Sequence, residues 1–350
     1  MPQFRTGRIE AILSERDGLQ RVTVRFDGGN PERAYVLRQL TGDVAVGDDV
    51  VVNTTAVELG LGTGGWHVVH WNLARDSWGE AGPGHIMKMR YTSLQIDTGA
   101  AEELLGEPDT DLGGLPVVAC SLHSQVGVVC AAIAAVRPGT RVIYVMTDGA
   151  ALPIALSDLV AELGAAQILF STVTAGHAFG GDHEAVSIAS GLTLARQLGA
   201  EVVVVGMGPG VVGTGSTLGT TAVEVASILD TAAALGALPI ACVRWSDVDE
   251  RPRHRELSHH TVTALTLVRS SVAVPTPDSR AHQLSIPVKH RVVEVTTPDM
   301  EQTLAELGLS ITTMGRGPGD DPGFFANSAA AGAFAAGRVG SGSDGASPGR

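Results

Sequence analysis

Residues 201–207 read EVVVVGM, an almost wholly apolar run that ends where a glycine-rich segment begins. Four similar runs are each followed by a segment with helical spacing of apolar residues. They are LPVVAC (115–120), RVIYVMT (141–147), AQILFSTV (166–173) and PIACV (239–243). Successive runs start about 25 to 38 residues apart, which is the spacing of strand–helix–strand units. Strands that are apolar on both faces are typical of a parallel sheet buried between helices, with right-handed crossovers.

We therefore predict a parallel α/β domain over residues 113–312, with helices on both faces of the sheet. The segments between the runs end in glycines such as Gly164 and Gly199, as helices often do. Helices are expected at 124–136, 153–164, 182–198, 218–236 and 259–270. A last strand at 291–295 and a helix at 299–307 close the domain.

Residues 1–95 have a different pattern, in which short β-forming runs are separated by turn signals. Examples are QRVTVRFD (20–27) and DVVVNTTAV (49–57). About five or six such strands in so short a segment predict a small N-terminal β barrel or sandwich domain. Residues 96–112 are expected to form a linker. The tail, residues 313–350, is rich in glycine and low in complexity, so it is expected to be disordered.

The charge balance excludes some classes of partner. Among the 350 residues, 24 are Lys or Arg and 37 are Asp or Glu, giving a net charge of −13. Nonspecific nucleic-acid binding requires a dense cationic surface, so no nucleic-acid partner is expected. The two lysines, Lys88 and Lys289, do not follow a glycine-rich loop, which excludes a Walker A nucleotide site.

Cysteine usage and the N-terminus bear on the compartment. The three cysteines lie in apolar runs and form neither a CxxC pair nor a zinc spacing, which predicts a reducing compartment. The N-terminal segment lacks the apolar core of a signal peptide, and no apolar stretch reaches the roughly 18 residues of a membrane span. We expect a cytoplasmic protein without a membrane partner. Whether it forms a homo-oligomer is left open.

Polar, small and titratable residues follow five of the predicted strands. Ligands of open parallel α/β sheets bind beyond the carboxyl ends of the strands. The segments at these ends are SLHS (121–124), TDG (147–149), TAGHAFGGD (174–182), GMGPGVVGTG (206–215) and RWSD (244–247). Each alone can be explained by the needs of a turn, but together they predict one binding site.

The richest of these loops is the glycine-rich segment 206–221. Gly208, Gly210 and Gly213 match the GxGxxG fingerprint of dinucleotide-binding folds, after a strand and before a helix. The match follows the fourth strand of the domain rather than the first. The acidic residue that ends the next strand, Asp247, is also farther away than the usual spacing of roughly 20 residues. Both facts weigh against a true Rossmann site for NAD.

A broader interpretation of this loop is anion binding. Its glycine N–H groups, including that of Gly215, and the hydroxyls of Thr214 and Ser216 would form a nest for a phosphate or carboxylate near a helix start. The alternative is a flexible crossover loop without a ligand.

A second candidate set comprises His177, Asp148, Asp182 and His123. Imidazole and carboxylate groups suit acid–base catalysis near neutral pH, or the binding of a divalent metal. Because the chain has no HExxH motif, metal binding is the weaker interpretation. Asp182 also fits the N-cap of a helix. His177 has no such capping role and is therefore the best catalytic candidate.

A third candidate is the charged segment 244–255. Arg244 or Arg253 would hold a phosphate or carboxylate in a bidentate manner over the glycine-rich loop. The alternative is a solvated loop whose arginines pair with its own acids. His259 and His260 precede the next helix, and one of them is expected to face the site.

A nucleophilic enzyme is a further alternative. Ser121, Ser124 and Cys120 lie at a strand end, but the chain has no GxSxG nucleophile elbow. Ser124 is equally well placed to cap the following helix.

Five motifs, taken together, resemble a bacterial family known as domain of unknown function 3866. They are NTTAVELGLGTGG (53–65), TDGAALP (147–153), TAGHAFGGD (174–182), GMGPGVVGTG (206–215) and RHRELSHHT (253–261). The resemblance covers nearly the whole chain apart from the tail. It implies a bacterial, and specifically actinobacterial, protein, but it implies neither an activity nor site residues.

The sequence thus favours an enzyme that acts on a small phosphorylated or carboxylated ligand at the strand ends. The alternative is a non-catalytic metabolite-binding or scaffold protein. Since both need the same anion site, the sequence does not separate them, and it specifies neither a cofactor nor a metal.

Overall fold

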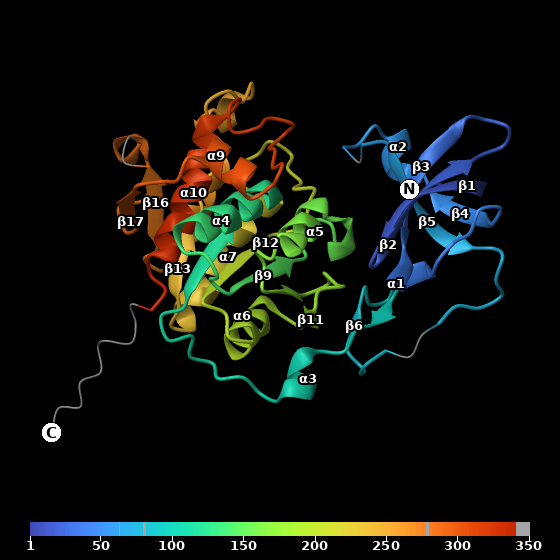
Figure 1. Cartoon of the computed structure of the whole chain (residues 1–350), viewed down its shortest axis with the longest axis horizontal. Coiled ribbons are helices and arrows are strands. Elements are labelled where there is room, and N and C mark those ends of the chain that lie inside the picture. The colour runs from blue at the N-terminus through green and yellow to red at the C-terminus, as the bar shows by residue number, and fades with distance from the viewer. Residues whose placement is uncertain (63, 80–81, 278–279, 341–350) are drawn as a thin grey trace. The chain divides into compact units, whose positions relative to one another are not determined.

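The computed structural model describes residues 1–62, 64–79, 82–277 and 280–340 (Figure 1). The chain divides into two compact units, Met1–Gly99 and Ala100–Arg350. The first contains a closed β barrel and the second an eight-stranded parallel sheet with helices, so the predicted fold class is confirmed.

Five strands close the barrel: β1 (Phe4–Arg16), β2 (Leu19–Arg25), β3 (Pro31–Leu37), β4 (Asp49–Asn53) and β5 (Trp66–Asn72). Their order is β1-β2-β3-β5-β4, and the β3–β5 pair is parallel while the others are antiparallel. Since strand side chains alternate, every second residue faces inward, as Val22 and Val24 do. The unit also contains α1 (Arg38–Thr41), α2 (Thr55–Glu58), β6 (Met87–Lys88) and β7 (Ile96–Asp97).

The sheet of the second unit has the strand order β11-β10-β9-β12-β8-β13-β16-β17, and all its strands are parallel. The strands are β8 (Pro116–Cys120), β9 (Val142–Thr147), β10 (Ser171–Thr174), β11 (His183–Glu184), β12 (Val202–Met207), β13 (Leu238–Ala241), β16 (Ala273–Pro277) and β17 (Arg291–Val295). A separate small pair, β14 (Trp245–Ser246) and β15 (Glu256–Leu257), lies within the segment that follows β13.

Eight helices belong to the described part of this unit. They are α3 (Ala101–Leu105), α4 (His123–Val136), α5 (Asp158–Ala165), α6 (Ile188–Gln197), α7 (Glu224–Ala234), α8 (His259–Leu267), α9 (Met300–Glu306) and α10 (Pro322–Ala336). Short 3-10 turns precede α5, α7 and α8, at Ile154–Leu156, Thr221–Val223 and Pro252–His254.

Two hydrophobic cores lie on opposite faces of the sheet. Successive residues of one strand face opposite sides, so Val204 belongs to one core and its neighbours Val203 and Val205 to the other. The first core is covered by α4, α5, α9 and α10, and the second by α6, α7 and α8. This explains why the strands are apolar throughout.

The prediction of a disordered tail was wrong for residues 322–336, which form the buried helix α10. Most of its alanines and its phenylalanines, among them Ala331, Phe324 and Phe325, are almost fully inaccessible to solvent. A helix that is apolar all round has no amphipathic period, because it is covered on every side, and its small residues allow close packing on α4. The last part of the predicted tail, residues 341–350, lies outside the described residues.

Other elements also differ from expectation, among them β16 and α6. Strand β16 was not predicted because Pro275 and Pro277 interrupt the β-forming pattern, although β16 pairs with strands on both sides. Helix α6 begins at Ile188 rather than near residue 182, because Ser187 is its N-cap.

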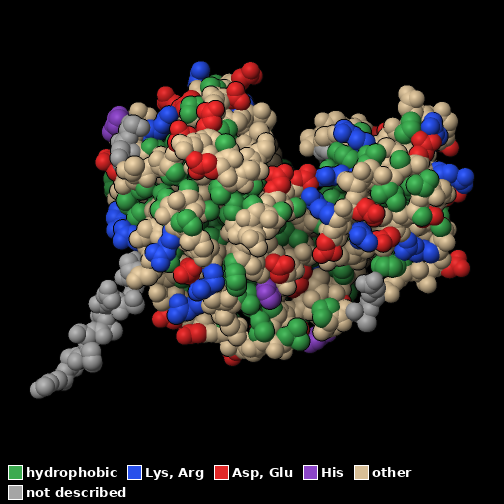
Figure 2. All heavy atoms as spheres, viewed as in Figure 1, with side chains coloured by type: hydrophobic (Ala, Val, Ile, Leu, Met, Phe, Trp, Pro, Cys, Tyr) green, Lys and Arg blue, Asp and Glu red, His purple; other side chains and the backbone are tan. Residues whose placement is uncertain are grey.

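Among the described residues, no helix is long and apolar enough to cross a membrane. On the visible face of the α/β unit, acidic, basic and apolar side chains are mixed, and no single type covers it (Figure 2).

Candidate functional site

The C-terminal ends of β9, β12, β8 and β13 lie side by side in the sheet. The helix after β8, α4, covers one face of the sheet, whereas the helix after β12, α7, covers the other. Where neighbouring strands send their connections to opposite faces, a crevice opens at the carboxyl edge of the sheet, and ligands of α/β proteins bind there. The segments that follow these four strands are therefore the candidate site.

Arg244 follows β13 and is the most unusual charge at this edge. Its side chain is buried, with only 7% of the residue exposed. Nη1 of Arg244 donates a hydrogen bond to Nδ1 of His260 over 3.0 Å, and its backbone N–H donates to the hydroxyl of Thr261. Burial, together with the nearby positive charges of Arg251 and Arg253, lowers the pKa of Arg244 to about 10.

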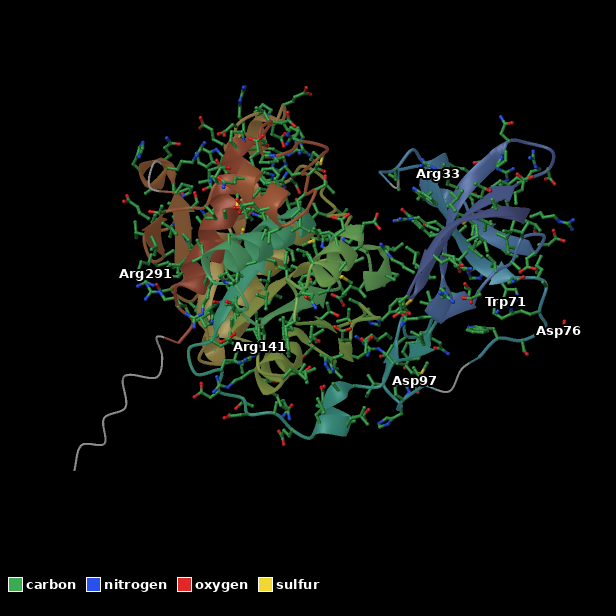
Figure 3. The ribbon with its side chains drawn as sticks, in the orientation of Figure 1. Arg33, Trp71, Asp76, Asp97, Arg141 and Arg291 are labelled. Carbon is green, nitrogen blue, oxygen red and sulfur yellow. The ribbon has the colours of Figure 1, made fainter. Side chains whose placement is uncertain are left out.

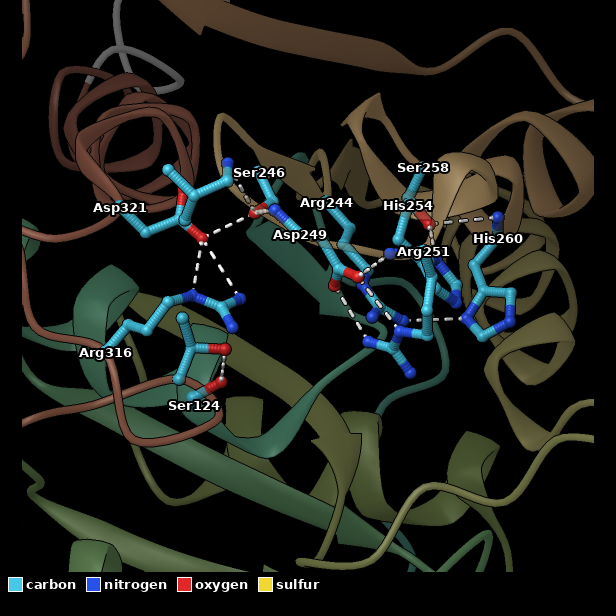
Figure 4. Close-up of polar contacts among 12 residues, drawn as sticks. Ser124, Arg244, Ser246, Asp249, Arg251, His254, Ser258, His260, Arg316 and Asp321 are labelled. Atoms are coloured by element: carbon cyan, nitrogen blue, oxygen red, sulfur yellow. Dashed lines mark hydrogen bonds and ion pairs between the residues drawn. The ribbon is translucent and has the colours of Figure 1, made fainter.

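The carboxylates near Arg244 are bound to other cations (Figure 4). Asp249 holds Arg251 in a bidentate pair, with distances of 2.9 and 2.8 Å. Asp321 accepts from Arg316 and from the hydroxyl of Ser246. Among the described residues, no carboxylate forms an ion pair with Arg244. The site therefore contains a buried guanidinium whose one side-chain partner is a neutral imidazole.

Three histidines, His254, His259 and His260, pack beside Arg244. Their ring centroids are 4.4 to 4.9 Å apart. Burial, together with the positive charge of Arg244, lowers the pKa of both His254 and His260 to about 3. Burial and the charges of Arg253 and Arg244 also lower the pKa of His259. All three imidazoles are therefore neutral near pH 7.

A pair of carboxyl groups lies beyond the ends of β9 and β12. Glu224, the first residue of α7, accepts a hydrogen bond from the hydroxyl of Thr147 over 2.5 Å. Burial raises the pKa of Glu224 to about 7, and the negative charge of Asp148 contributes to this rise. Asp148 accepts a hydrogen bond from the backbone N–H of His177 over 3.0 Å. Two of the predicted residues, Asp148 and His177, are thus brought together, although this bond does not use the imidazole.

Glu224 was missed by the sequence analysis. Its position at a helix start offers the ordinary explanation that an acidic residue is favourable there. The signal that could have identified it is its place after the glycine-rich loop that follows β12, the strand next to β9, whose end carries Asp148. Its burial, which sets its pKa, depends on tertiary packing.

His123 is held in the interior by hydrogen bonds at both of its ring nitrogens. Its Nδ1 donates to the carbonyl oxygen of Met207 over 3.2 Å, and its Nε2 accepts from the hydroxyl of Ser157 over 2.6 Å. Burial lowers the pKa of His123 to about 4. These contacts tie α4 to β12 and to the N-cap of α5, so they give His123 a structural role.

Asp182 lies away from the other predicted catalytic residues along β10. Its carboxylate accepts from the hydroxyls of Ser171 and Thr172 and from the backbone N–H of Thr172, near the start of that strand. The predicted N-cap role of Asp182 was wrong, since Ser187 caps α6. Asp182 instead fixes the loop that leads to β11.

The glycine-rich loop does not run directly into a helix. Sixteen residues separate Met207 at the end of β12 from Glu224 at the start of α7. A Cβ on Gly208 would lie 2.6 Å from the carbonyl oxygen of Ala151, so glycine is required there by a close backbone approach. Gly210 has a φ of +98°, which favours glycine.

Residues 213–220 close on themselves as a small hairpin. Gly213 forms a bridge with Thr220. Thr214 and Ser216 bond to each other, and both also bond to the backbone of Gly219. The hydroxyls predicted to bind an anion are therefore engaged within the loop.

Arg253 lies beside the tip of this hairpin. A Cβ on Gly215 would be 3.6 Å from Nη1 of Arg253. The glycine-rich loop and the arginine segment, predicted separately, thus border one another.

The three predicted nucleophiles, Ser121, Cys120 and Ser124, have contacts that serve the fold. Oε1 of Gln125 accepts from the hydroxyl and the backbone N–H of Ser121. Burial raises the pKa of Cys120 well above its usual value, which keeps the thiol protonated. Ser124 contacts the hydroxyl of Thr313 at 3.4 Å.

Comparison with known proteins gives one match. A search of curated proteins and a search of solved structures each returned no significant similarity. The profile of one family, described as "Protein of unknown function (DUF3866)", matches residues 33–332. This range includes the barrel from within β3 onward and nearly the whole α/β unit, together with every candidate site residue described above. The chain therefore belongs to the family of domain of unknown function 3866.

Proposed function

We propose that the α/β unit binds a small molecule with a phosphate or carboxylate group at the C-terminal ends of β12, β8 and β13. The observation that carries this proposal is the buried guanidinium of Arg244, which has no carboxylate partner among the described residues. A buried charge is costly unless an opposite charge and hydrogen bonds compensate it. An anionic ligand would supply both.

The surroundings of Arg244 support an anion. Arg251, Arg253 and Arg316 are close enough to lower its pKa, whereas Asp249 raises it. Arginine presents several N–H groups in one plane, which suits the bidentate binding of phosphate or carboxylate. The exposed backbone of the loop at Gly215 borders Arg253 and would complete the ligand's surroundings.

We further propose that the protein is an enzyme that uses Glu224 as its acid–base group. With a pKa of about 7, Glu224 is present in both protonation states at neutral pH, which is favourable for general acid–base catalysis. Asp148 helps to keep Glu224 protonated. The turn Thr221–Val223, directly before Glu224, packs against α8, which begins at His259. Through this contact, the segment that carries Glu224 adjoins the helix that carries His259 and His260, the neighbours of Arg244.

The second candidate function is binding without turnover. The observation that favours it is the structural engagement of two predicted catalytic residues, His123 and Asp182. The role of Glu224 distinguishes the two functions. An enzyme needs a titrating group beside the ligand, whereas a binding protein needs only the positive charges of the arginines. The cytoplasmic location and the lack of a nucleic-acid partner remain predictions from the sequence.

The test is a titration with inorganic phosphate, followed by calorimetry and by thermal unfolding. The variants are Arg244→Gln and the control Arg141→Gln. Arg141 precedes β9 at the opposite edge of the sheet, where it donates to the carbonyl oxygen of Gly199 (Figure 3). We expect phosphate to raise the melting temperature of the wild type and of the control, because a ligand that binds the folded state stabilises it. Arg244→Gln should weaken binding at least tenfold.

Equal phosphate affinity in all three proteins would contradict the proposal. So would the absence of binding to the wild type by phosphate, acetate and citrate alike. If Arg244→Gln loses binding while Glu224→Gln retains it, a screen of phosphate esters for turnover distinguishes the two functions. Turnover by the wild type that Glu224→Gln lacks supports the enzyme.

A further inference from the structure

We propose that His254, His259 and His260 bind one divalent transition-metal ion, with Zn²⁺ as the best fit. One ring nitrogen from each residue lies within 4.8 Å of the other two. Imidazole is a preferred ligand of Zn²⁺, and three protein ligands with one open position are typical of catalytic zinc. This proposal goes beyond the anion site, and it is carried by the three histidines and their contacts.

The three imidazoles come from a short segment with a defined local structure. His254 ends the 3-10 turn Pro252–His254, and Ser258 caps α8, which starts with His259 and His260. Adjacent residues at a helix start diverge around the helix axis, yet here both rings contact His254. The nitrogens of two imidazoles on a tetrahedral Zn²⁺ are about 3.3 Å apart. The ring nitrogens must therefore approach one another by up to roughly 1.5 Å when the ion binds.

The hydrogen bonds of two rings suit metal binding. Nε2 of His259 is buried and has no hydrogen-bond partner in the described structure. An orphaned buried nitrogen is costly, and a metal ion would satisfy it. Nδ1 of His254 lies 2.8 Å from the hydroxyl of Ser258. A hydrogen bond on one ring nitrogen orients the ring and leaves the other nitrogen for the metal (Figure 4).

The third ring connects the metal with Arg244. Nδ1 of His260 accepts the hydrogen bond from Arg244, so its lone pair already faces a cation. A metal ion bound through Nδ1 replaces this hydrogen bond and frees an N–H of the guanidinium. The neutral state of all three imidazoles at pH 7 is also the state that binds metals. The nearby arginines oppose a bare cation, and they favour an anionic fourth ligand on the metal.

The experiment uses full-length protein without an affinity tag, stripped of metal with a chelator. Zn²⁺ is titrated by calorimetry and Co²⁺ by visible absorption, for the wild type, His259→Ala and His260→Gln. His183→Ala is the control, since His183 lies in the edge strand β11. We expect one ion per chain in the wild type and the control, and at least tenfold weaker binding in the other two variants. Circular dichroism verifies that each variant is folded.

Absence of Zn²⁺ binding to the wild type would overturn the proposal, as would equal affinity in the folded variants. If a variant does not fold, X-ray absorption of the zinc-loaded wild type still tests the ligands. Three imidazoles around the ion are expected, and fewer than two would exclude the site.

Discussion

The guanidinium of Arg244 donates a hydrogen bond to Nδ1 of His260, and this 3.0 Å contact joins the segment after β13 to the start of α8. Because Nδ1 accepts, the proton of this neutral imidazole is on Nε2. A hydrogen bond from a cation to a neutral acceptor stabilises that cation less than a hydrogen bond to a carboxylate does. The contact therefore holds Arg244 in place while leaving its charge uncompensated.

Arg244→Met should weaken ligand binding without destabilising the free protein. Methionine has a similar length and carries no charge, so it removes the cost of burying a cation. In phosphate-free buffer we expect this variant to be as stable as the wild type, or more stable by up to about 2 kcal/mol. Phosphate should stabilise the wild type alone. Urea unfolding with and without phosphate measures both effects, and a loss of more than about 2 kcal/mol without phosphate would show that the charge is compensated within the fold.

Glu224→Gln should be more stable than the wild type above neutral pH. The folded pKa of Glu224 is raised to about 7, so the unfolded chain releases this proton at lower pH than the folded chain does. Wild-type stability should consequently fall as the pH rises from about 4.5 to 7, and then become constant. At pH 8 we expect the variant to be more stable by about 1 to 3 kcal/mol.

The measurement is urea unfolding at pH 5 and pH 8, with Glu162→Gln as an exposed control on α5. The control should follow the wild type at both values. A Glu224→Gln variant whose stability advantage does not grow between pH 5 and pH 8 would contradict the raised pKa.

His123→Gln should reduce the loss of stability in mild acid. The folded pKa of His123 is lowered to about 4, so its contribution is complete above about pH 6.5 and is lost as the pH falls toward 4. Between pH 7 and 5 the wild type should lose about 2 kcal/mol more than the variant. Unfolding at these two pH values tests this difference. His183→Gln should behave as the wild type, and an equal acid response in all three proteins would contradict the lowered pKa.

Gly332→Ala should destabilise the α/β unit although alanine is the better helix former. A Cβ at position 332 would lie against the carbonyl oxygen of Val129 in α4, closer than an ordinary van der Waals contact. We expect a loss of about 1 to 3 kcal/mol from the forced separation of α10 and α4. Gly164→Ala is the matched control, since it adds a Cβ that meets no atom within 4 Å. It should be neutral or stabilising by up to about 1 kcal/mol. Thermal unfolding compares the two variants, and equal stability would show that the helices can separate at no cost.

The sequence predicts most of the sheet because its central strands carry their own signal. The runs around Val118, Val145 and Val204 are apolar at every position, and such a pattern occurs where helices cover both faces. The glycine-rich and charged segments are also placed at the correct edge, because all parallel strands end there. The strands β8, β9, β12 and β13 can therefore be predicted from their composition alone.

Other features depend on contacts that local patterns do not carry. Strand β16 contains Pro275 and Pro277, and it is a strand because β13 and β17 offer it partners on either side. Helix α10 is too uniformly apolar to show a period. The uncompensated charge of Arg244 also requires tertiary structure, because the sequence offers several acids nearby, and the fold assigns Asp249 to Arg251. The burial of Glu224 likewise depends on tertiary packing.

Helix α10 also affects the order in which the chain can fold during synthesis. It packs on α4, β8, β13 and β16, elements that the ribosome makes up to two hundred residues earlier, at roughly 5 to 20 residues per second. For roughly ten seconds or longer, this face of the sheet lacks the part of its cover that α10 provides. The nascent α/β unit is then a substrate for chaperones and a source of aggregation, and it becomes a closed structure only after residue 336 has emerged.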